Sequence, residues 1–520
     1  MAVITHQDIK VVCKTAIQSL VHFEYHTERD GHIYAEIVGQ IPMEEVASPH
    51  RGTVNEFIEI KATGHEWGER SIFTGMIIAK SFGKSNGRDQ IIIRAVSSTW
   101  AMDIEEKSRS FQDANHTYKG LVEYILSEYD NGDMIFDGVD RLIEGPLIQY
   151  QETDWAFIRR IMSHLGVTVR AECRTKKILF ICGEYNSGKR CEVDDRTYSL
   201  YFDQNYYFES ASPLYDRGNY VYYEVNETRQ YQLGDQAVIE GRRLTIYEKS
   251  GRMEKGILHF GYRLANQTAT EVKRYDNQRL VGRALTGTVL AVKRECIKVH
   301  LEIDKEQSEA SAYFFPWCPL SGNLLYGMPE VGERVRLYLP DGREQNAIGI
   351  NVLRNEAMRA TLPDASQRYF RTADNKGISL IPTAVGIKAV GTTGASTEIS
   401  MGDEQGIVMT ASRAVSVIAE GQLVLKGHRI VIEAAKEASL VRKDMLSPTV
   451  VNLCNTFDLI GMTGGMKRVV PPSQDIKMMP LVTKDRYEVG AAMRAVLCSI
   501  PAEPTTAVVI DTVMAGLPVI

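Results

Sequence analysis

The sequence lacks the features that mark most membrane, secreted and nucleic-acid-binding proteins. Its 520 residues carry a formal net charge of -6, so no nucleic-acid partner is expected. No run of 18 apolar residues is present, which excludes a membrane-spanning helix of ordinary length. The N-terminus has no basic segment followed by an apolar one, so we expect no signal peptide.

Catalytic motifs are also missing. His65-Glu66 lacks the second histidine of a zinc-protease helix, and no Gly-x-Ser-x-Gly elbow occurs. Gly183 to Lys189 spells GxxxxGK, but Arg190 stands where a phosphate-binding loop needs Ser or Thr. Strand-like sequence rather than a helix follows, so we expect a hairpin turn at 186–188.

Cysteine is scarce, with eight residues and no Cys-x-x-Cys pair. Cys173, Cys182 and Cys191 are evenly spaced, but metal-ligand pairs are normally two to four residues apart. We therefore expect buried, reduced thiols. The sequence predicts no catalytic residue, no metal and no cofactor, and hence no enzyme.

What the sequence does contain is mostly β-strand pattern. Over residues 1–265, short apolar or alternating runs are separated by Gly, Pro and Asn. Two helices with one apolar face interrupt them, at about 117–129 and 154–165. Thr153 or Asp154 can cap the second helix, and we expect Trp155 to lie in the core. The polar residues 269–284 are expected to be helical.

The third quarter of the chain changes character. Residues 283–353 are typical of a compact five-strand barrel, with Trp317 expected in its core. Residues 371–441 are short strands separated by glycines, predicted at 375–380, 386–390, 396–401, 406–411, 414–421, 422–427 and 428–434. Strands so short are stable only against neighbours, either solenoid turns or copies of the chain. The expected inward residues alternate along the later strands: Val415, Val417, Leu423, Leu425, Ile430 and Ile432.

Several local sequences match one family. They are Ser98-Thr99-Trp100, residues 107–112, Thr117-Tyr118, Gln149-Tyr150-Gln151-Glu152-Thr153-Asp154-Trp155 continuing to Arg160, Leu285 to Val289, Pro316 to Pro319, 327–335, 347–349 and 375–380. The order and content of these segments resemble VgrG proteins and the late control D proteins of phage tails. The most specific match is the run from Gln149 to Arg160 with Gly166 beyond it.

The resemblance implies a mainly β chain that forms the homotrimeric hub and spike of a contractile injection system. It implies a hub of two barrel-like domains (1–282), an OB-fold (283–353), a linker (354–370) and a trimeric β-helix or β-prism spike (371–445). Residues 446–520 form an extension of unknown fold. The implied partners are the hexameric inner tube, baseplate wedge proteins, a PAAR-like tip protein, effector cargo and, transiently, a target membrane.

The implied location is a baseplate assembled in the cytoplasm and delivered outside the cell on contraction or in a released particle. Two other functions stay open. One is an enzymatic or toxic tail at 446–520. The other is a glycan- or receptor-binding module that uses the tyrosines between 198 and 223.

Overall fold

A computed structural model gives the structure of the chain in two compact units, Met1–Met358 and Arg359–Ile520. It describes residues 3–27, 31–46, 56–64, 68–183, 187–194, 196–202, 204, 220–266, 272–319, 327–353, 366–372, 374–436, 438–442, 449–453, 459–462, 465–468 and 508–509. The chain is mainly β, as the sequence predicts.

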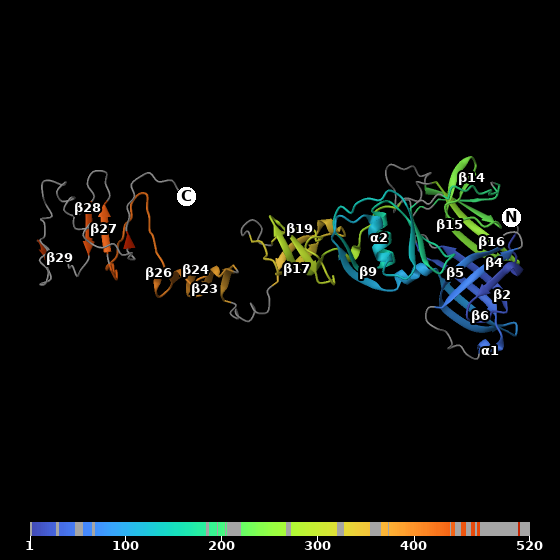
Figure 1. Ribbon diagram of the computed structural model, residues 1–520, viewed down its shortest axis with the longest axis horizontal. Coiled ribbons are helices and arrows are strands. Elements are labelled where there is room, and N and C mark those ends of the chain that lie inside the picture. The colour runs from blue at the N-terminus through green and yellow to red at the C-terminus, as the bar shows by residue number, and fades with distance from the viewer. Residues whose placement is uncertain are drawn as a thin grey trace. The chain divides into compact units, whose positions relative to one another are not determined.

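The first unit contains an 11-stranded sheet (Figure 1). Its strands are β1 (Ile9–Val12), β2 (Ser19–Thr27), β3 (Ile33–Gln40), β4 (Phe57–Gly64), β5 (Gly68–Ser85), β6 (Arg88–Val96), β12 (Ser199–Phe202), β13 (Val221–Glu227), β14 (Gln236–Ile239), β15 (Arg242–Glu254) and β16 (Ile257–Ala265). The order is β1-β4-β5-β6-β3-β2-β15-β16-β13-β12, with β14 on β15.

The two halves of this sheet meet where β2 pairs with β15, at Tyr25 and Gly251. A Cβ on Gly251 would lie 2.3 Å from Cε1 of Tyr25, so only glycine lets the ring pass this closely. Short helices accompany the sheet: η1 (His6–Asp8), α1 (Met43–Val46) and η3 (Ser98–Asp103).

A helical module follows the first six strands. It comprises β7 (Glu106–Phe111), α2 (Tyr118–Leu126), β8 (Gly132–Asp137), β9 (Leu147–Thr153), α3 (Asp154–Ser163), β10 (Val169–Ala171) and β11 (Ile178–Gly183). The two predicted helices are confirmed, and the Thr153 side chain caps α3 by accepting a hydrogen bond from the Ala156 amide. β7 pairs with β9, and β10, β11 and β8 form a separate sheet.

One apolar core joins the helical module to the large sheet. Trp155 is 1% exposed, which confirms its predicted burial. Its ring lies 4.8 Å from the ring of His32, the residue before β3, and 5.6 Å from the Phe180 ring of β11. These contacts fix α3 between the two sheets.

A five-stranded antiparallel sheet completes the first unit, in the order β19-β18-β17-β20-β21. The strands are β17 (Arg283–Lys293), β18 (Cys296–Leu301), β19 (Phe314–Pro316), β20 (Arg334–Leu339) and β21 (Ile348–Val352), with η6 (Gln278–Leu280) before them and η8 (Glu344–Asn346) before β21. Trp317 is only half-buried at the edge of this core, with its indole N–H donating to Gly327 O at 2.9 Å. Trp317 packs against the core of this sheet, as expected, but is only partly buried.

The helix expected at 269–284 is also wrong for its described part. Residues 272–277 have no regular secondary structure, and η6 is the only helix from 272 to 284. The backbone instead bonds to the end of α3: Val272 N donates to Gly166 O, and Tyr275 N donates to Ser163 Oγ. The segment is therefore a docked linker, since its polar groups are satisfied by α3 rather than by helical bonds.

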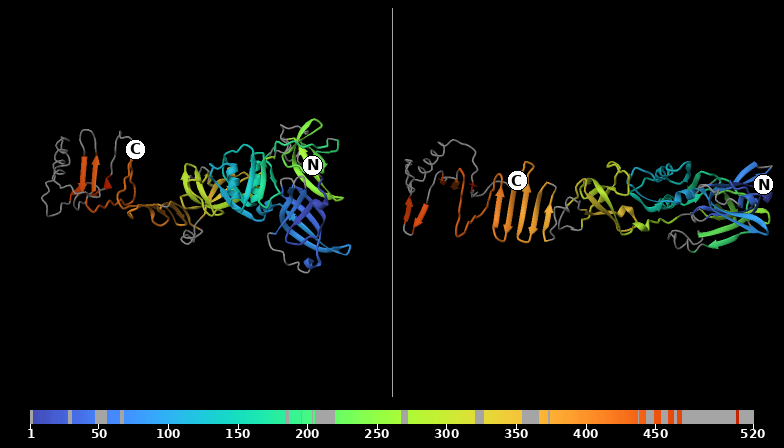
Figure 2. Two further views of the ribbon diagram at one scale, coloured as in Figure 1. Left: turned by 45° about the vertical axis from the view of Figure 1, so that its right-hand side comes forward. Right: turned by 90° about the horizontal axis from the view of Figure 1, so that it is seen from below.

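The second unit begins with a five-stranded antiparallel meander (Figure 2). Its strands are β22 (Arg368–Arg371), β23 (Lys376–Ile381), β24 (Ala384–Val390), β25 (Ser396–Gly402) and β26 (Gly406–Ala411), which lie side by side in sequence order. Shorter strands follow: β27 (Ala438–Arg442), β28 (Thr449–Leu453), β29 (Leu459–Met462), β30 (Gly465–Arg468) and β31 (Val508–Val509).

The first four short strands predicted in this region are confirmed, whereas the last three are not. Residues 413–436 contain no strand. The six side chains expected to point inward are 38–57% exposed: Val415, Val417, Leu423, Leu425, Ile430 and Ile432. An alternating sequence forms a strand only when another backbone pairs with it, and residues 413–436 pair with no strand in the described part of the chain.

Candidate functional sites: an ionic junction and an apolar sheet face

The GxxxxGK segment at 183–189 is the sequence motif that came nearest to a phosphate-binding loop. In the GxxxxGK segment, residues 184–186 lie outside the described residues, as does the start of the expected turn at 186–188. Residues 187–194 form no helix; Lys189 O instead accepts from Gln236 N, and Arg190 forms a bridge to the same residue. A phosphate-binding helix N-terminus therefore does not follow Lys189.

The cysteines differ in burial. Cys173, Cys182 and Cys191 are buried free thiols, as expected. Cys318 is exposed, and Cys13 and Cys296 are only partly buried, so the expectation of uniformly buried thiols is wrong. The spacing of cysteines along the sequence does not reveal that Cys318 follows an edge strand.

The described residues contain neither a metal-binding cluster nor a membrane-spanning helix. No group of three or more His, Cys, Asp or Glu side chains there could hold a metal ion. No helix within the described ranges is long and apolar enough to cross a membrane.

The first candidate site is a buried ionic junction around α3. The Asp154 carboxylate is fully buried and accepts four hydrogen bonds, from Lys107 Nζ at 2.7 Å, Arg109 Nη2 at 2.8 Å, Tyr129 Oη at 2.6 Å and Gln149 Nε2 at 2.8 Å. Burial would raise the pKa of Asp154, but these hydrogen bonds outweigh it and lower the pKa. The carboxylate is therefore a charged centre that joins β7, the turn after α2, β9 and α3.

Arg160 extends this network to the five-stranded sheet. Its side chain is 1% exposed. Its Nε donates to Glu152 Oε1 at 3.0 Å, its Nη1 to Glu344 Oε1 at 2.8 Å and its Nη2 to Ile148 O at 3.0 Å. Burial opposes the charge of Arg160, but the two carboxylates outweigh it and raise its pKa. Because Glu344 belongs to η8, this ion pair connects α3 with the five-stranded sheet.

A second set of polar contacts joins the same two parts. The Asp304 carboxylate accepts from the Ser110 hydroxyl at 2.6 Å and from the Ser110 backbone N–H. Gln112 Nε2 donates to Val299 O at 3.0 Å, and Gln112 Oε1 accepts from Tyr313 N at 3.2 Å. The end of β7 is thus tied to the five-stranded sheet, since these groups have protein partners in place of water.

The linker before the five-stranded sheet carries a third contact. The His164 side chain is 2% exposed, and its Nε2 lies 3.7 Å from Asp276 Oδ1. Within the described residues this nitrogen has no hydrogen-bond partner. Burial, together with Arg274 and Arg160, lowers the pKa of His164 to about 3. The imidazole is therefore neutral near pH 7.

The sequence pointed to part of this junction. Gln149, Glu152, Asp154 and Arg160 all lie in the run that carried the family resemblance. No role could be given to them from sequence alone. Glu344 was missed because it is 184 residues from Arg160 along the chain, and no local pattern marks such a partner.

The second candidate site is one face of the β22–β26 sheet. Residues that pair across antiparallel strands point to the same face. One row across the strands is Phe370, Ile378, Ile387, Ile399 and Met409, and the next row on that face includes Leu380, Val385, Met401 and Ile407. This set of nine residues is called the apolar face below.

The opposite face of the sheet is mainly polar or glycine. Its rows are Tyr369, Ser379, Gly386, Ser400 and Val408, then Arg371, Gly377, Lys388, Glu398 and Thr410. Lys388 and Glu398 form an ion pair of 3.4 Å across neighbouring strands. The two faces thus divide by polarity, as in a sheet with one face turned to a core.

Among the described residues, no core covers the apolar face. Seven of its nine side chains are 40–68% exposed: Phe370, Ile378, Leu380, Ile387, Met401, Ile407 and Met409. From residue 348 onward, none of the described side chains is a buried hydrophobic one. An apolar surface of this kind marks a contact site for another molecule.

Comparison with known proteins gives the fold. A family model, the Alg8 N-terminal domain, matches residues 54–181, which is less than half of the chain. No curated protein matches. A chain of the Francisella PdpA–VgrG complex in its lidded form matches with a TM-score of 0.52 and 7% identity, covering 75% of this chain and 76% of that chain.

Two further solved structures are similar. The half-lidded form of the Francisella complex gives a TM-score of 0.50 and 9% identity over 78% of this chain and 87% of the other. An Escherichia coli protein is described as a component of the type VI secretion system with structural similarity to the T4 phage tail proteins gp27 and gp5. It gives a TM-score of 0.48 and 11% identity over 66% of this chain and 100% of the other. The chain therefore shares its fold with a chain of the Francisella PdpA–VgrG complex.

Proposed function

We propose that this chain is the hub and spike of a contractile injection system baseplate, with a mechanical rather than enzymatic role. In this proposal residues 1–282 form the hub, 283–353 an OB-fold collar, 354–370 a linker and 371–445 the spike. Residues 446–520 are an extension at the tip. The fold likeness supports the class of protein, and the uncovered apolar face is the observation that carries the spike assignment.

The apolar face favours assembly of several copies. Each copy presents two rows of large apolar side chains that its own chain leaves in water, and bringing such faces together buries them. Two copies would suffice for a sandwich, but the resemblance to spike proteins favours three. In a trimer each face contacts the other two around one axis, and the symmetry closes.

The exposed segment 413–436 fits the same assembly. Its apolar residues alternate as in a strand, yet it pairs with no strand among the residues that the structure describes. Strands of neighbouring copies would supply the missing backbone bonds and would leave no open edge. In the spike, β22–β26 would pair within each chain, and residues 413–436 would pair between chains.

The ionic junction fits a mechanical role in the first unit. A force along the spike must pass from the collar into the hub without separating them. Arg160 with Glu344, and Asp304 with Ser110, join the two by buried polar contacts that have defined geometry. Apolar contacts alone slide more easily than directional hydrogen bonds.

The partners follow from the role. The hub would bind the hexameric inner tube and baseplate wedge proteins, and the extension would bind a PAAR-like tip protein or cargo. The target membrane would be met only during contraction. The protein would be made and assembled in the cytoplasm and then leave the cell on contraction or within a released particle.

Adjacent residues of β25 allow a matched test. Ile399 lies on the apolar face and Ser400 on the polar face of the same strand. Ile399→Asp should convert the purified protein to monomers, because it places three carboxylates in one apolar core. Ser400→Asp should keep the assembly intact. Both variants are measured by light scattering, and an intact assembly in both would refute the assigned face.

A further inference from the structure

Residues 413–436 carry large apolar side chains on both faces of the expected strands. In the proposed assembly, the six alternating residues from Val415 to Ile432 face the other copies. Their neighbours along the chain face the opposite way, because side chains alternate along a strand. Three of these neighbours are large and apolar, namely Ile418, Val424 and Val431. These three residues are called the outward stripe below.

The outward stripe is the most exposed part of this apolar segment. Its three side chains are 63–70% exposed, whereas the six inward ones are 38–57% exposed. Pairing between copies would cover the inward residues and would leave the stripe in water on every copy. Single apolar residues on a surface are ordinary, but here one recurs on each of three successive expected strands. Such a patch indicates a contact with another molecule.

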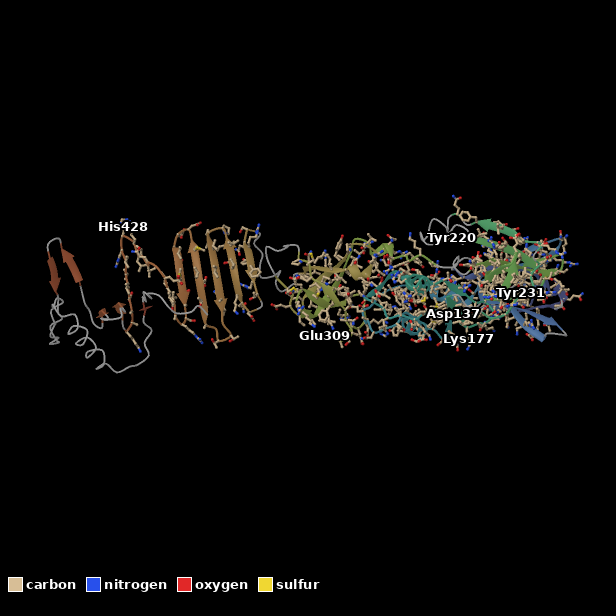
Figure 3. The ribbon with its side chains drawn as sticks, turned by 90° about the horizontal axis from the view of Figure 1, so that it is seen from above. Asp137, Lys177, Tyr220, Tyr231, Glu309 and His428 are labelled. Carbon is tan, nitrogen blue, oxygen red and sulfur yellow. The ribbon has the colours of Figure 1, made fainter. Side chains whose placement is uncertain are left out.

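Cations accompany the outward stripe. Residues 413–436 have a net charge of +2 with histidine neutral, whereas the whole chain has -6. Lys426, His428 and Arg429 all lie between Val424 and Val431, and all three are exposed; His428 is labelled in Figure 3. Lys426 and Arg429 form no ion pair with a described residue. The four cations of the segment are Arg413, Lys426, Arg429 and Lys436, and its two anions are Glu420 and Glu433.

The combination of apolar and cationic side chains selects one class of partner. An acidic protein or a nucleic acid would pair with Lys426 and Arg429 but would leave the valines in water. A bilayer surface with anionic phospholipids offers phosphate groups to the cations and, just beneath them, hydrocarbon to the valines. The bilayer surface therefore complements both parts of the stripe.

We propose that the outward stripe, together with Lys426 and Arg429, binds the surface of a bilayer that contains anionic phospholipid. Three copies would present three stripes, so contacts that are weak in one copy would add in the assembly. This inference deepens the membrane contact of the proposed function and rests on it, because pairing between copies decides which side chains face outward. The stripe would hold the shaft against the membrane that it meets during contraction.

The test mixes the full chain with vesicles of phosphatidylcholine, with or without an equal part of phosphatidylglycerol. Sedimentation measures the protein bound to lipid, and light scattering measures its mass. We expect the anionic vesicles to bind at least about tenfold more tightly than the neutral ones, and added salt to weaken that binding. A trimer that binds neither vesicle would overturn only the lipid site. A monomer that binds the anionic vesicles would refute only the threefold spike.

A soluble acidic polymer, polyglutamate, separates lipid from an acidic protein as the partner. It offers negative charge without hydrocarbon, so it should compete with the anionic vesicles only weakly. Binding to polyglutamate as tight as binding to the vesicles would assign the cations to an acidic protein and overturn the proposal.

Substitutions on neighbouring positions test the outward direction of the stripe. Val424→Ser with Val431→Ser should weaken vesicle binding by about tenfold or more and leave the mass of the assembly unchanged. Leu423→Ser with Ile430→Ser changes the adjacent inward residues of the same expected strands and should instead lower the mass toward that of a monomer. Vesicle binding that is unchanged in the valine variant, or a mass that falls equally in both variants, would overturn the stripe.

A second pair of variants tests the cations. Lys426→Gln with Arg429→Gln should remove the preference for phosphatidylglycerol. Arg371→Gln with Lys388→Gln is the matched control, because it removes the same number of charges from the polar face of the β22–β26 sheet. The control should keep the preference. An equal loss in both variants would assign vesicle binding to net charge alone and overturn the site.

Discussion

The ionic junction buries charged side chains, whereas the apolar face exposes large apolar ones. The junction buries charges, and Asp154 and Arg160 each meet several partners inside the chain. The β22–β26 sheet leaves large apolar side chains exposed, and no described residue of the chain covers them. Fully burying one such side chain contributes about 1.5–3 kcal/mol. The difference teaches that burial follows the available partners: the described charges of the junction have partners in the first unit, whereas the proposal assigns the partners of the apolar face to other copies.

The strongest way to break the junction is to remove Arg160. Arg160→Met would leave Glu152 and Glu344 as buried carboxylates without their cation. We expect a loss of about 3–5 kcal/mol in the free energy of unfolding of the first unit, which chemical denaturation measures.

The matched control is Arg334→Met. Arg334 pairs with Glu302, but both side chains are more than half exposed. Removing this surface pair should cost less than about 1 kcal/mol. Similar losses in the two variants would show that the junction contributes no more than a surface ion pair.

A smaller effect is expected at the start of α3. Thr153→Ala removes the hydroxyl that caps the helix and also bonds to the Asp103 carboxylate. The expected loss in stability is about 0.5–2 kcal/mol, measured by denaturant titration. Thr153→Ser keeps the hydroxyl and should restore most of the stability; no recovery would assign the loss to packing of the methyl group.

The smallest effect is a dependence on pH at the linker. His164 is neutral in the folded chain, with its pKa lowered to about 3, whereas an unfolded histidine has its ordinary pKa of about 6.5. Below pH 6.5 the unfolded state therefore binds more protons, so stability falls as pH falls toward 3. Over the first pH unit below 6.5 the loss is at most about 1 kcal/mol.

His164→Gln tests this assignment, because glutamine does not titrate. The difference in thermal midpoint between neutral and mildly acidic buffer should be smaller in the variant than in the original chain. The same pH dependence in both would mean that other groups, such as Asp103 or Asp154, govern it.

Local features of the fold were predictable from the sequence, whereas long-range partners were not. The apolar spacing and the Thr153 cap of α3 are local signals, and the structure confirms both. Arg160 belongs to the same helix but is buried, which helical spacing does not reveal, because its environment comes from Glu344 in a distant loop. The helix expected at 269–284 failed because contacts with α3 replaced local hydrogen bonds.

In the second unit, too, the sequence pattern does not reveal where the pairing partner of a strand comes from. The alternation in β23 to β26 predicted strands correctly, since each has a neighbour in its own chain. The equally regular alternation from Val415 to Ile432 gives no strand in one chain. Alternation reports which side chains a strand could bury, but it does not say whether the pairing backbone belongs to the same molecule.

The most direct test of the central claim is the solution mass of the purified chain by light scattering at several concentrations. The proposal predicts a stable species close to three times the chain mass of 58.3 kDa, because the apolar face and the segment 413–436 are completed by other copies. A monomer at all concentrations would contradict the proposal, and a stable dimer would contradict the threefold spike.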